Sequence, residues 1–400
     1  MVNTIWKFST AGEVQFGRGS RENLATELVA LKVQRPILIT DASLMMIPVV
    51  AELIQQLMSS AILAVFDGSA AEPSVKIAEN AALAAAEHRA DCIIGLGGGS
   101  NLDVAKVTAI VQAHGGKPQD YFGFDRVPGP VTPLIALPTT AGTGSEVSHS
   151  AVLTDTDNAI KVSILSRWLR PRVAIVDPAL TDSCPAKVTA DSGMDALVHA
   201  IEAYSNRPFE QLEDVSSEAR AYQGSYALTK MLAGDAISRG GKYLQRAVET
   251  PNDQLARDQM SQAAMLAGMA FSNSGVGIVH ALEYPIGALT HCGHGEGNGL
   301  LLPHVMRFNL RHCESQFAEI ARLLGCSDHL PDGELAHQAI ERIETLQRAI
   351  GIPSRLRDLG LGESQIDGVA SKAIEIRRLM DLNRRTPTKE DLITILRAAF

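Results

Sequence analysis

The sequence of 400 residues has few aromatic residues, few cysteines and no long apolar run. Aromatic residues make up only 4% of the chain, so aliphatic side chains and alanine must fill the core. The five cysteines are odd in number and form no CxxC pair, which argues against a disulfide framework or a thiolate zinc site and favours a reducing compartment. No window of about 20 uninterrupted apolar residues occurs, so we predict no membrane span.

Basic residues do not cluster in this acidic chain. The net charge is −9, and the basic runs are only pairs such as Arg377–Arg378 and Arg384–Arg385. Pairs are too short for a surface that tracks phosphates, so we expect neither nucleic acid nor a membrane as partner. The N-terminus has no basic segment followed by an apolar block, which is not the pattern of a signal peptide. We therefore expect a cytoplasmic protein.

The first part of the chain, residues 1–186, alternates between short apolar runs and amphipathic stretches. Strands alternating with helices indicate βαβ units and a mostly parallel, doubly wound sheet. The predicted strands are 36–40, 62–67, 92–96, 133–137 and 173–177, and the predicted helices are 45–58, 75–88 and 102–113. A β-hairpin is expected from 148–153 and 160–165, which flank the polar turn 154–158.

Helical periodicity dominates residues 187–400. Predicted helices cover 194–203, 217–232, 255–271, 314–324 and 335–350. The sequence therefore predicts a doubly wound α/β domain over 1–186 and an all-helical domain over 187–400. No low-complexity linker separates them, so we expect the domains to pack closely and to leave a cleft between them.

Two glycine-rich segments follow predicted strands. Gly97, Gly98, Gly99 and Ser100 come directly before a predicted helix, where glycines and free helix N–H groups favour an anion such as phosphate. A tight βα turn without a ligand is the alternative. The second segment, 138–146, places three hydroxyl groups and two glycines between Thr140 and Ser145. Loops at the carboxyl ends of strands line the ligand crevice of open α/β sheets, so a nucleotide is favoured.

Asp41 follows the predicted strand 36–40. A carboxylate at such a strand end can accept hydrogen bonds from an adenosine ribose. The alternative is that Asp41 caps a helix beginning near Ser43, and the sequence leaves both interpretations open.

One carboxylate and three imidazoles are candidate metal ligands. Asp195 and His199 are four residues apart, so they share one face of a predicted helix. His280 and His294 come later in the chain. This set suits a divalent transition metal that acts as a Lewis acid. For each histidine taken singly, a capping or surface position is the alternative.

These motifs occur within a longer resemblance. From end to end the chain resembles the iron-containing (group III) alcohol dehydrogenase family. The matching stretches are FGRGS (16–20), GLGGGSNLDVAK (95–106), PTTAGTGSEV (138–147), VDPAL (176–180), GMDALVHAIEAY (193–204), GMAFSNSGVGIVHALEYPIGAL (268–289), HGEGNGLLLPHVMRFN (294–309) and the terminal NRRTPTKEDLITILRAAF.

The resemblance implies an NAD(H)-dependent oxidoreductase with its active site in the cleft between the domains. Its Rossmann-like domain over 1–186 would bind the dinucleotide, and its helical domain over 187–400 would bind iron(II), or alternatively zinc(II). The family's metal ligands correspond to Asp195, His199, His280 and His294. Its coenzyme-binding positions correspond to Asp41, Gly97, Gly98, Gly99, Ser100, Asp103, Thr139, Thr140, Thr143, Ser145 and Lys161. The expected assembly is a homo-oligomer, a homodimer or larger.

Two positions depart from the family's pattern. Tyr284 stands where many members carry a second histidine near the substrate, four residues after His280. Glu72 stands where many have asparagine before the proline of the loop after the second strand. Tyr284 and His291 are the candidate catalytic residues, since either could pass the reaction's proton to solvent. Packing and support of the ligands are the alternative roles, and shaping of the pocket is favoured for Tyr284.

The expected reaction is hydride transfer between nicotinamide and the carbonyl carbon of a small aldehyde or ketone, or the reverse oxidation of an alcohol. A hydroxyacid–oxoacid transhydrogenase that retains its coenzyme is an alternative within the family. A lyase of the dehydroquinate synthase type would need several basic residues that 193–204 and 268–309 lack, except for Arg307. A non-catalytic metal-dependent binding protein is a further alternative, against which the two nucleotide loops argue.

Overall fold

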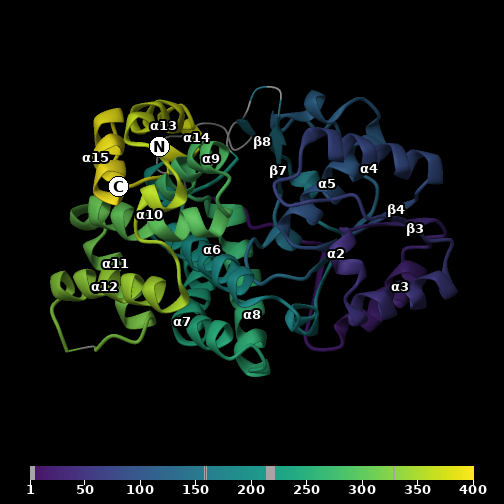
Figure 1. Ribbon diagram of the computed structural model, residues 1–400, viewed down its shortest axis with the longest axis horizontal. Helices are drawn as coiled ribbons and strands as arrows, with labels where there is room; N and C mark the ends of the chain where they lie inside the picture. The colour runs from purple at the N-terminus through teal and green to yellow at the C-terminus, as the bar shows by residue number, and fades with distance from the viewer. Residues whose placement is uncertain (1–4, 157, 159, 213–220, 328) are drawn as a thin grey trace. The chain divides into compact units, whose positions relative to one another are not determined.

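The computed structural model describes residues 5–156, 158, 160–212, 221–327 and 329–400 (Figure 1). The chain divides into two compact units. One unit is Thr10–Cys184, and the other is Pro185–Phe400 with the N-terminal residues up to Ser9. The first unit is an α/β unit and the second is helical, which confirms the predicted fold class.

A six-stranded sheet forms the centre of the α/β unit. The strand order is β1-β9-β6-β4-β2-β3, and every neighbouring pair is parallel. The strands are β1 (Glu13–Phe16), β2 (Pro36–Ile39), β3 (Ala64–Phe66), β4 (Cys92–Gly97), β6 (Leu134–Pro138) and β9 (Val173–Val176). All five predicted strands are present, and β1 is an additional edge strand.

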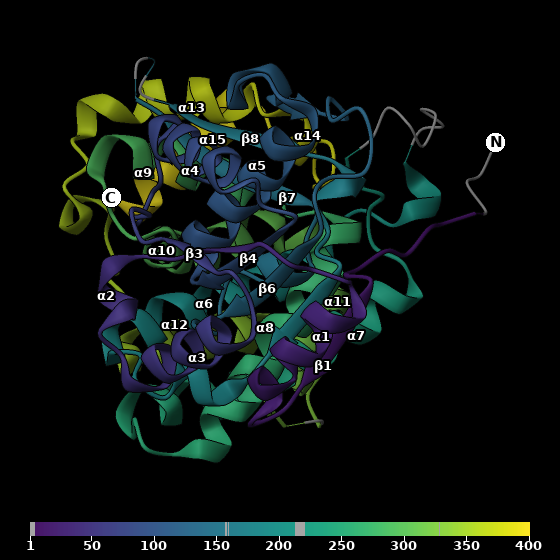
Figure 2. The ribbon, with the colours of Figure 1, turned by 90° about the vertical axis from the view of Figure 1, so that its right-hand side faces the viewer.

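Helices cover both faces of this sheet (Figure 2). They are α1 (Leu24–Ala30), α2 (Ala42–Met45), α3 (Pro48–Ser60), α4 (Val75–His88) and α5 (Gly99–His114). Successive residues of a strand point to opposite faces. Leu38 accordingly joins a core with α1 and α3, whereas Ile37 and Ile39 join a core with α4 and α5.

The helix predicted over 45–58 is α3 in the structure, which begins three residues later than predicted, and a separate short helix precedes it. Helix α2 ends at Met45, and α3 begins at Pro48, after Ile47 in an extended conformation. Proline lacks the N–H needed inside a helix but fits its first position, so it begins a new helix instead of continuing the preceding one.

A smaller three-stranded sheet packs on the outer side of α4 and α5. It contains β5 (Gly123–Phe124), β7 (Ser150–Asp155) and β8 (Ile160–Leu165). The antiparallel pair β7–β8 is the predicted hairpin, with its first strand beginning two residues later than expected. Residue 157 of the predicted turn lies outside the described residues, and Thr154 belongs to β7.

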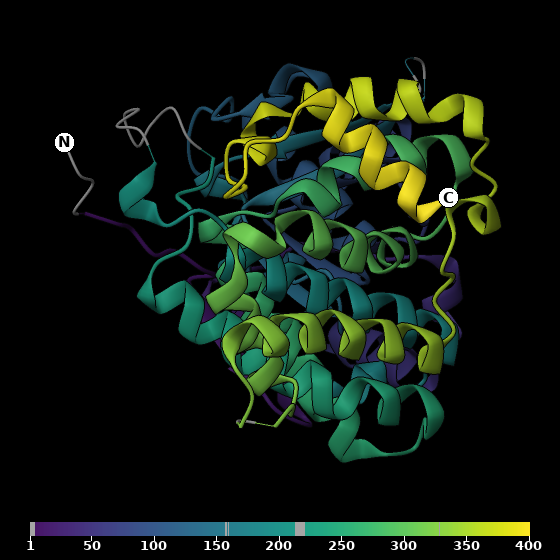
Figure 3. The ribbon, with the colours of Figure 1, turned by 90° about the vertical axis from the view of Figure 1, so that its left-hand side faces the viewer.

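The second unit consists mainly of helices (Figure 3). They are α6 (Ala186–Ser205), α7 (Ala227–Glu249), α8 (Gln254–Ser274), α9 (Ile278–Thr290), α10 (His294–Asn309), α11 (Glu314–Leu323), α12 (Asp332–Ile350), α13 (Ile366–Ile374), α14 (Arg377–Met380) and α15 (Lys389–Ala399). Helix α6 is the central one, because it packs on α7, α8 and α10 and is buried almost continuously from Gly193 to Ala203.

The helix predicted over 217–232 is only partly confirmed. Residues 217–220 lie outside the described part of the chain, and the helix α7 begins at Ala227. The Thr229 hydroxyl accepts a hydrogen bond from the backbone N–H of Tyr226. This local bond satisfies the N–H group that precedes the first helical residue.

No single helix in the described ranges is long and apolar enough to cross a membrane. Helices α8 and α9 meet that criterion only together, and they are bent by 103° at the break between them.

Candidate functional site

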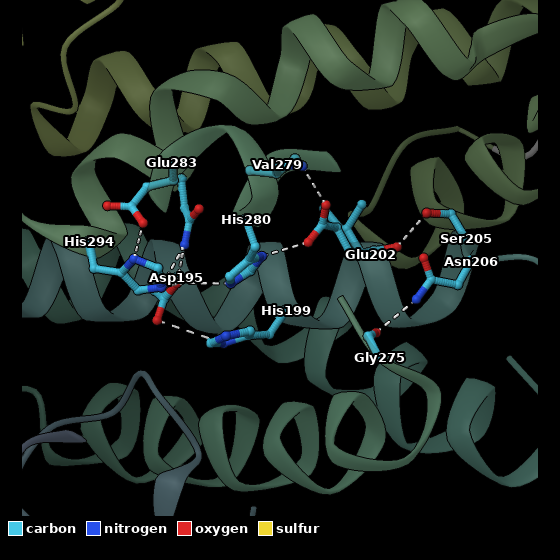
Figure 4. A network of polar contacts seen from close by, with 12 residues as sticks. Asp195, His199, Glu202, Ser205, Asn206, Gly275, Val279, His280, Glu283 and His294 are labelled. Atoms are coloured by element: carbon cyan, nitrogen blue, oxygen red, sulfur yellow. Dashed lines mark hydrogen bonds and ion pairs between the residues drawn. The ribbon is translucent and has the colours of Figure 1, made fainter. Parts of the chain in front are cut away.

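Three predicted metal ligands converge inside the helical unit (Figure 4). One ligand atom each from Asp195, His280 and His294 lies within 4.8 Å of the other two. The Nε2 atoms of His280 and His294 are both 3.8 Å from Oδ1 of Asp195. His199 lies outside this triplet but adjoins it, since its Nδ1 is 3.7 Å from Oδ2 of Asp195.

Close packing of α6 and α10 brings these residues together. Asp195 and His199 lie one turn apart on α6, and His294 is the first residue of α10. Gly295 permits the approach of the two helices, because a Cβ at this position would lie 2.0 Å from the carbonyl oxygen of Asp191. Any larger residue at 295 would therefore force α6 and α10 to shift relative to each other.

Two buried carboxylates orient the histidine rings. Oε2 of Glu202 accepts a hydrogen bond from Nδ1 of His280 at 2.6 Å, and Oε2 of Glu283 accepts one from Nδ1 of His294 at 2.5 Å. Glu202 also accepts the backbone N–H of Val279 at 2.8 Å, which caps the start of α9. With the proton on Nδ1, the neutral imidazole presents a lone pair at Nε2, the form in which imidazole binds a metal.

The arrangement fits a bound cation. Nε2 of His280 is buried and has no hydrogen-bond partner in the described part of the chain. It lies 3.8 Å from Oδ1 of Asp195, so a neutral His280 ring and the carboxylate present two acceptors to each other. Two atoms that each lie about 2.1 Å from a shared ion can be up to about 4.2 Å apart. The N–O separations of 3.7 and 3.8 Å fall within this limit.

Asp195 is held in its charged form. Burial alone would raise the pKa of this carboxyl, but the charge on His199, His294 and His280 when these rings are protonated, together with the amide of Asn298, lowers it below its ordinary value. The Asn298 amide donates to Oδ1 of Asp195 at 2.8 Å. An ionised carboxylate among imidazoles is the donor set that a divalent transition metal prefers.

The two histidine-orienting glutamates and Asn298 are absent from the sequence-based prediction. Glu283 follows His280 by three residues, yet it binds His294 of the next helix. Glu202 belongs to α6 and binds His280 of α9. The only signal in the sequence is their position in the same helical stretches as the ligands, which does not indicate which residue each one meets.

The two predicted proton-relay residues have different surroundings. The Tyr284 ring stacks on His294, with 6.0 Å between the ring centroids and 23° between the planes. His291 is exposed and ends α9 in the left-handed conformation, with φ of 55°. Tyr284 therefore adjoins the histidine cluster, whereas His291 lies at a helix end.

The α/β unit brings the two glycine-rich loops together. Strands β4 and β6 pair in register up to Gly97 and Pro138, and the backbone N–H of Thr139 donates to the carbonyl of Gly97 at 3.0 Å. A Cβ at Gly99 would lie 2.6 Å from the Thr143 side chain. Gly97 has φ of +144°, a region that only glycine adopts readily. The helix α5 begins directly after this turn.

Asp41 is a helix cap, and its position also keeps it at the carboxyl end of β2. Its Oδ1 accepts the backbone N–H groups of Ser43 and Leu44 at 3.0 and 3.1 Å, which caps α2. Oδ1 also accepts the Ser43 hydroxyl, whereas Oδ2 accepts only the Asn101 amide and keeps a lone pair, so capping does not exclude a contact between Oδ2 and a ribose.

Lys161 forms an ion pair with Glu72, the residue that stands where many family members have asparagine. Its Nζ is 3.0 Å from Oε2 of Glu72, and the lysine side chain is only 6% exposed. Glu72 has φ of +52°, in the left-handed region. Glutamate is not among the residues that adopt this conformation readily, whereas asparagine is.

A buried polar network supports the second glycine-rich loop. The Ser145 hydroxyl donates to Asp103 at 2.7 Å and accepts from the fully buried Lys106 at 2.8 Å. The other Asp103 oxygen accepts the backbone N–H of Val152. Two predicted coenzyme residues, Asp103 and Ser145, thus join α5 to the loop and to β7.

Glu146 beside this network gives a pH prediction. Burial raises its pKa from 4.5 to about 7, although its own backbone N–H and Lys106 oppose the shift. Between pH 4.5 and about 7, the Glu146 carboxyl is deprotonated in the unfolded chain but still protonated in the folded chain. The free energy of unfolding therefore falls as the pH rises through this range. Glu146→Gln should remove this part of the decline in denaturant titrations from pH 5 to 7. Glu79→Gln, at an exposed pair with Lys76, is the control, and an unchanged slope in Glu146→Gln would contradict the assignment.

Comparison with known proteins places the chain among alcohol dehydrogenases. Residues 11–178 match the family described as "Iron-containing alcohol dehydrogenase", and residues 189–400 match "Fe-containing alcohol dehydrogenase family, C-terminal". The chain is 33% identical to the NAD-dependent methanol dehydrogenase of Bacillus methanolicus, over 96% of this chain and 97% of that protein. It is 31% identical to lactaldehyde reductase of Escherichia coli K12, with the same coverage.

Solved structures agree with this relationship. A crystal structure of a 1,3-propanediol oxidoreductase superposes with a TM-score of 0.92 at 32% identity, covering 99% of this chain and 100% of that one. The matches span both units and include every stretch that carries the metal cluster and the glycine-rich loops. The chain therefore belongs to the iron-containing alcohol dehydrogenase family and is an enzyme of the oxidoreductase class.

Proposed function

We propose that this enzyme is a metal-dependent, NAD(H)-linked alcohol dehydrogenase that also reduces small aldehydes or ketones. The observation that carries the proposal is the convergence of His280 and His294 lone pairs on the Asp195 carboxylate. Relatives named as an NAD-dependent methanol dehydrogenase and a lactaldehyde reductase support the coenzyme and the substrate class. A cytoplasmic location and a homo-oligomeric state stay predictions.

The residues that would hold the metal are Asp195, His199, His280 and His294. Four nitrogen and oxygen donors without thiolate suit iron(II), and zinc(II) is the alternative. When bound, such an ion supplies positive charge that polarises a carbonyl group and stabilises an alkoxide. Glu202 and Glu283 hold two imidazoles in the tautomer and orientation that binding requires.

The α/β unit would bind the coenzyme. Gly97–Ser100 and the first turn of α5 offer backbone N–H groups to the pyrophosphate, and Thr139, Thr140 and Thr143 add hydroxyl groups opposite them. Asp41 would accept hydrogen bonds from the adenosine ribose.

Tyr284 is the proposed proton-relay residue, because its ring lies against His294. Its phenol can both accept and donate a proton at a position next to the ligand cluster. The exposed His291 would receive the proton closer to solvent.

The direct test is hydride transfer measured by NADH absorbance. Purified enzyme loaded with iron(II) or zinc(II) is assayed with a panel of alcohols plus NAD and of aldehydes plus NADH. We expect turnover with at least one uncharged pair. Turnover between an alcohol and a carbonyl compound without added coenzyme would indicate a transhydrogenase instead, and no absorbance change with any compound would refute the proposal.

Glu72→Asn should lower the KM for NADH. The ion pair with Glu72 holds the Lys161 ammonium, which is proposed to face the anionic coenzyme. Asparagine tolerates the left-handed conformation and is neutral, so it releases Lys161 without strain. The gain should be up to about fivefold, the size of a partly exposed ion pair, with kcat changed little. Steady-state kinetics of Glu72→Asn and the control Glu79→Gln check this, and an unchanged or higher KM in Glu72→Asn would contradict it.

A further inference from the structure

Asn101 links the first glycine-rich loop to Asp41. It lies in the first turn of α5 and is 3% exposed. Its Nδ2 donates to Oδ2 of Asp41 at 2.8 Å and to the backbone carbonyl of Leu96 at 3.2 Å. The link spans two loops that follow neighbouring strands, because β2 pairs with β4 in register at Ile39 and Gly95.

The chemistry of the two partners fixes the orientation of this amide. A carboxylate and a carbonyl are both acceptors, so the NH₂ group of Asn101 must face them, and each of its two hydrogens is used. The Asp41 carboxylate is consequently held from two sides. Ser43 and Leu44 bind Oδ1, while Asn101 binds Oδ2, and together these bonds fix the plane of the carboxylate.

Asn101 holds Asp41 without neutralising its charge. Burial would raise the pKa of Asp41, but bonds from Ser43, Asn101 and the backbone of Leu44 lower it below its ordinary value. The carboxylate is therefore ionised at neutral pH. A lysine or arginine in place of Asn101 would cancel this charge, whereas an amide donates only a hydrogen bond.

We propose that Asn101 is a positioning residue for coenzyme choice. It holds the Asp41 carboxylate in the orientation that accepts hydrogen bonds from an unphosphorylated ribose and repels a 2′-phosphate. The inference rests on the proposed use of NAD(H) and on Asp41 facing the ribose. In the absence of the amide, Oδ1 still caps α2, but Oδ2 can rotate away from the position that a 2′-phosphate would occupy.

The test measures binding of NADH and NADPH to the full-length enzyme by titration calorimetry. Asn101→Ala should reduce the ratio of the NADPH Kd to the NADH Kd by about tenfold, the size of one hydrogen bond to a charged group. Thr108→Val is the matched control, since it removes another buried polar group of α5, a hydroxyl bonded to the Val104 carbonyl, and should leave the ratio unchanged.

Two further variants keep the result interpretable. Asn101→Leu has a similar size and no donor for Asp41, so it tests the link if the space left by alanine prevents folding. In an Asp41→Ala background, Asn101→Ala should change the ratio no further. A shift that persists in that background, or a folded Asn101 variant with the wild-type ratio, would overturn the proposal.

Binding and turnover separate this inference from the proposed function. An enzyme that binds NADH more tightly than NADPH but transfers no hydride would refute the dehydrogenase activity, and the Kd ratio would still test the role of Asn101. Hydride transfer by a wild-type enzyme that binds both coenzymes equally would leave the dehydrogenase standing and overturn the role of Asn101.

Discussion

His280→Ala should abolish metal binding and lower kcat/KM by at least about a thousandfold while the protein stays folded. The imidazole supplies a ligand atom that the structure holds in place through Glu202. Its removal leaves Asp195, His199 and His294 as an incomplete set of ligands. Without the metal, no positive charge would polarise the reacting oxygen. Metal content measured by mass spectrometry, together with NADH oxidation, checks both parts.

Chelation of the wild-type enzyme provides the complementary experiment. Activity should vanish on treatment with a chelator and return on anaerobic addition of iron(II), with zinc(II) compared in parallel. His304→Ala is the matched control, because His304 lies on α10 with His294 but ten residues away. It should retain metal and activity. Full activity of the chelated, metal-free enzyme would show that the metal hypothesis is wrong.

The parallel sheet could be predicted from the sequence because its inner strands are buried on both faces. Runs such as Pro36–Ile39 and Cys92–Gly97 are apolar at nearly every position, which only a covered strand requires. The edge strand β1 escaped prediction for the opposite reason. In Glu13–Phe16 polar and apolar residues mix, and the strand is partly or fully exposed throughout.

The metal ligands could be proposed from residue type and spacing, but their partners could not. The i, i+4 spacing of Asp195 and His199 defines a helical face by itself. The bonds of Glu202 and Glu283 depend on how α6, α9 and α10 pack, and this packing depends on small residues such as Gly295. Local periodicity carries no information about such contacts.

Asp41 shows how one residue can satisfy two interpretations. The sequence left a ribose contact and a helix cap open, and the structure shows the cap on Oδ1. The second oxygen is bound by Asn101, a residue 60 positions later. Only the pairing of β2 with β4 reveals this contact, which makes the carboxylate a fixed charge at a strand end.

This fixed charge should determine coenzyme choice. A 2′-phosphate would share the space next to Asp41, and two anions a few Å apart in a partly shielded site repel by about 1–4 kcal/mol. That repulsion corresponds to roughly fivefold to several-hundredfold discrimination in favour of NADH. Arg35 cannot offset it, because it precedes β2 at the opposite end of the strand and donates to the carbonyl of His88 at 2.7 Å.

Asp41→Gly should therefore remove most of the preference for NADH. The ratio of kcat/KM for NADH to that for NADPH should fall towards one at fixed ionic strength, since salt screens the repulsion. Loss of the α2 cap should cost only roughly a few tenths of a kcal/mol, because glycine is itself tolerated at the position before a helix. Asp91→Asn is the control, because that carboxylate also binds backbone N–H groups, at Gln34 and Arg35, but lies at the amino end of β2. Asp41 is the only anion among the described residues 41–45. A wild-type enzyme that does not prefer NADH, or an Asp41→Gly variant that still prefers it, would show that Asp41 does not have this role.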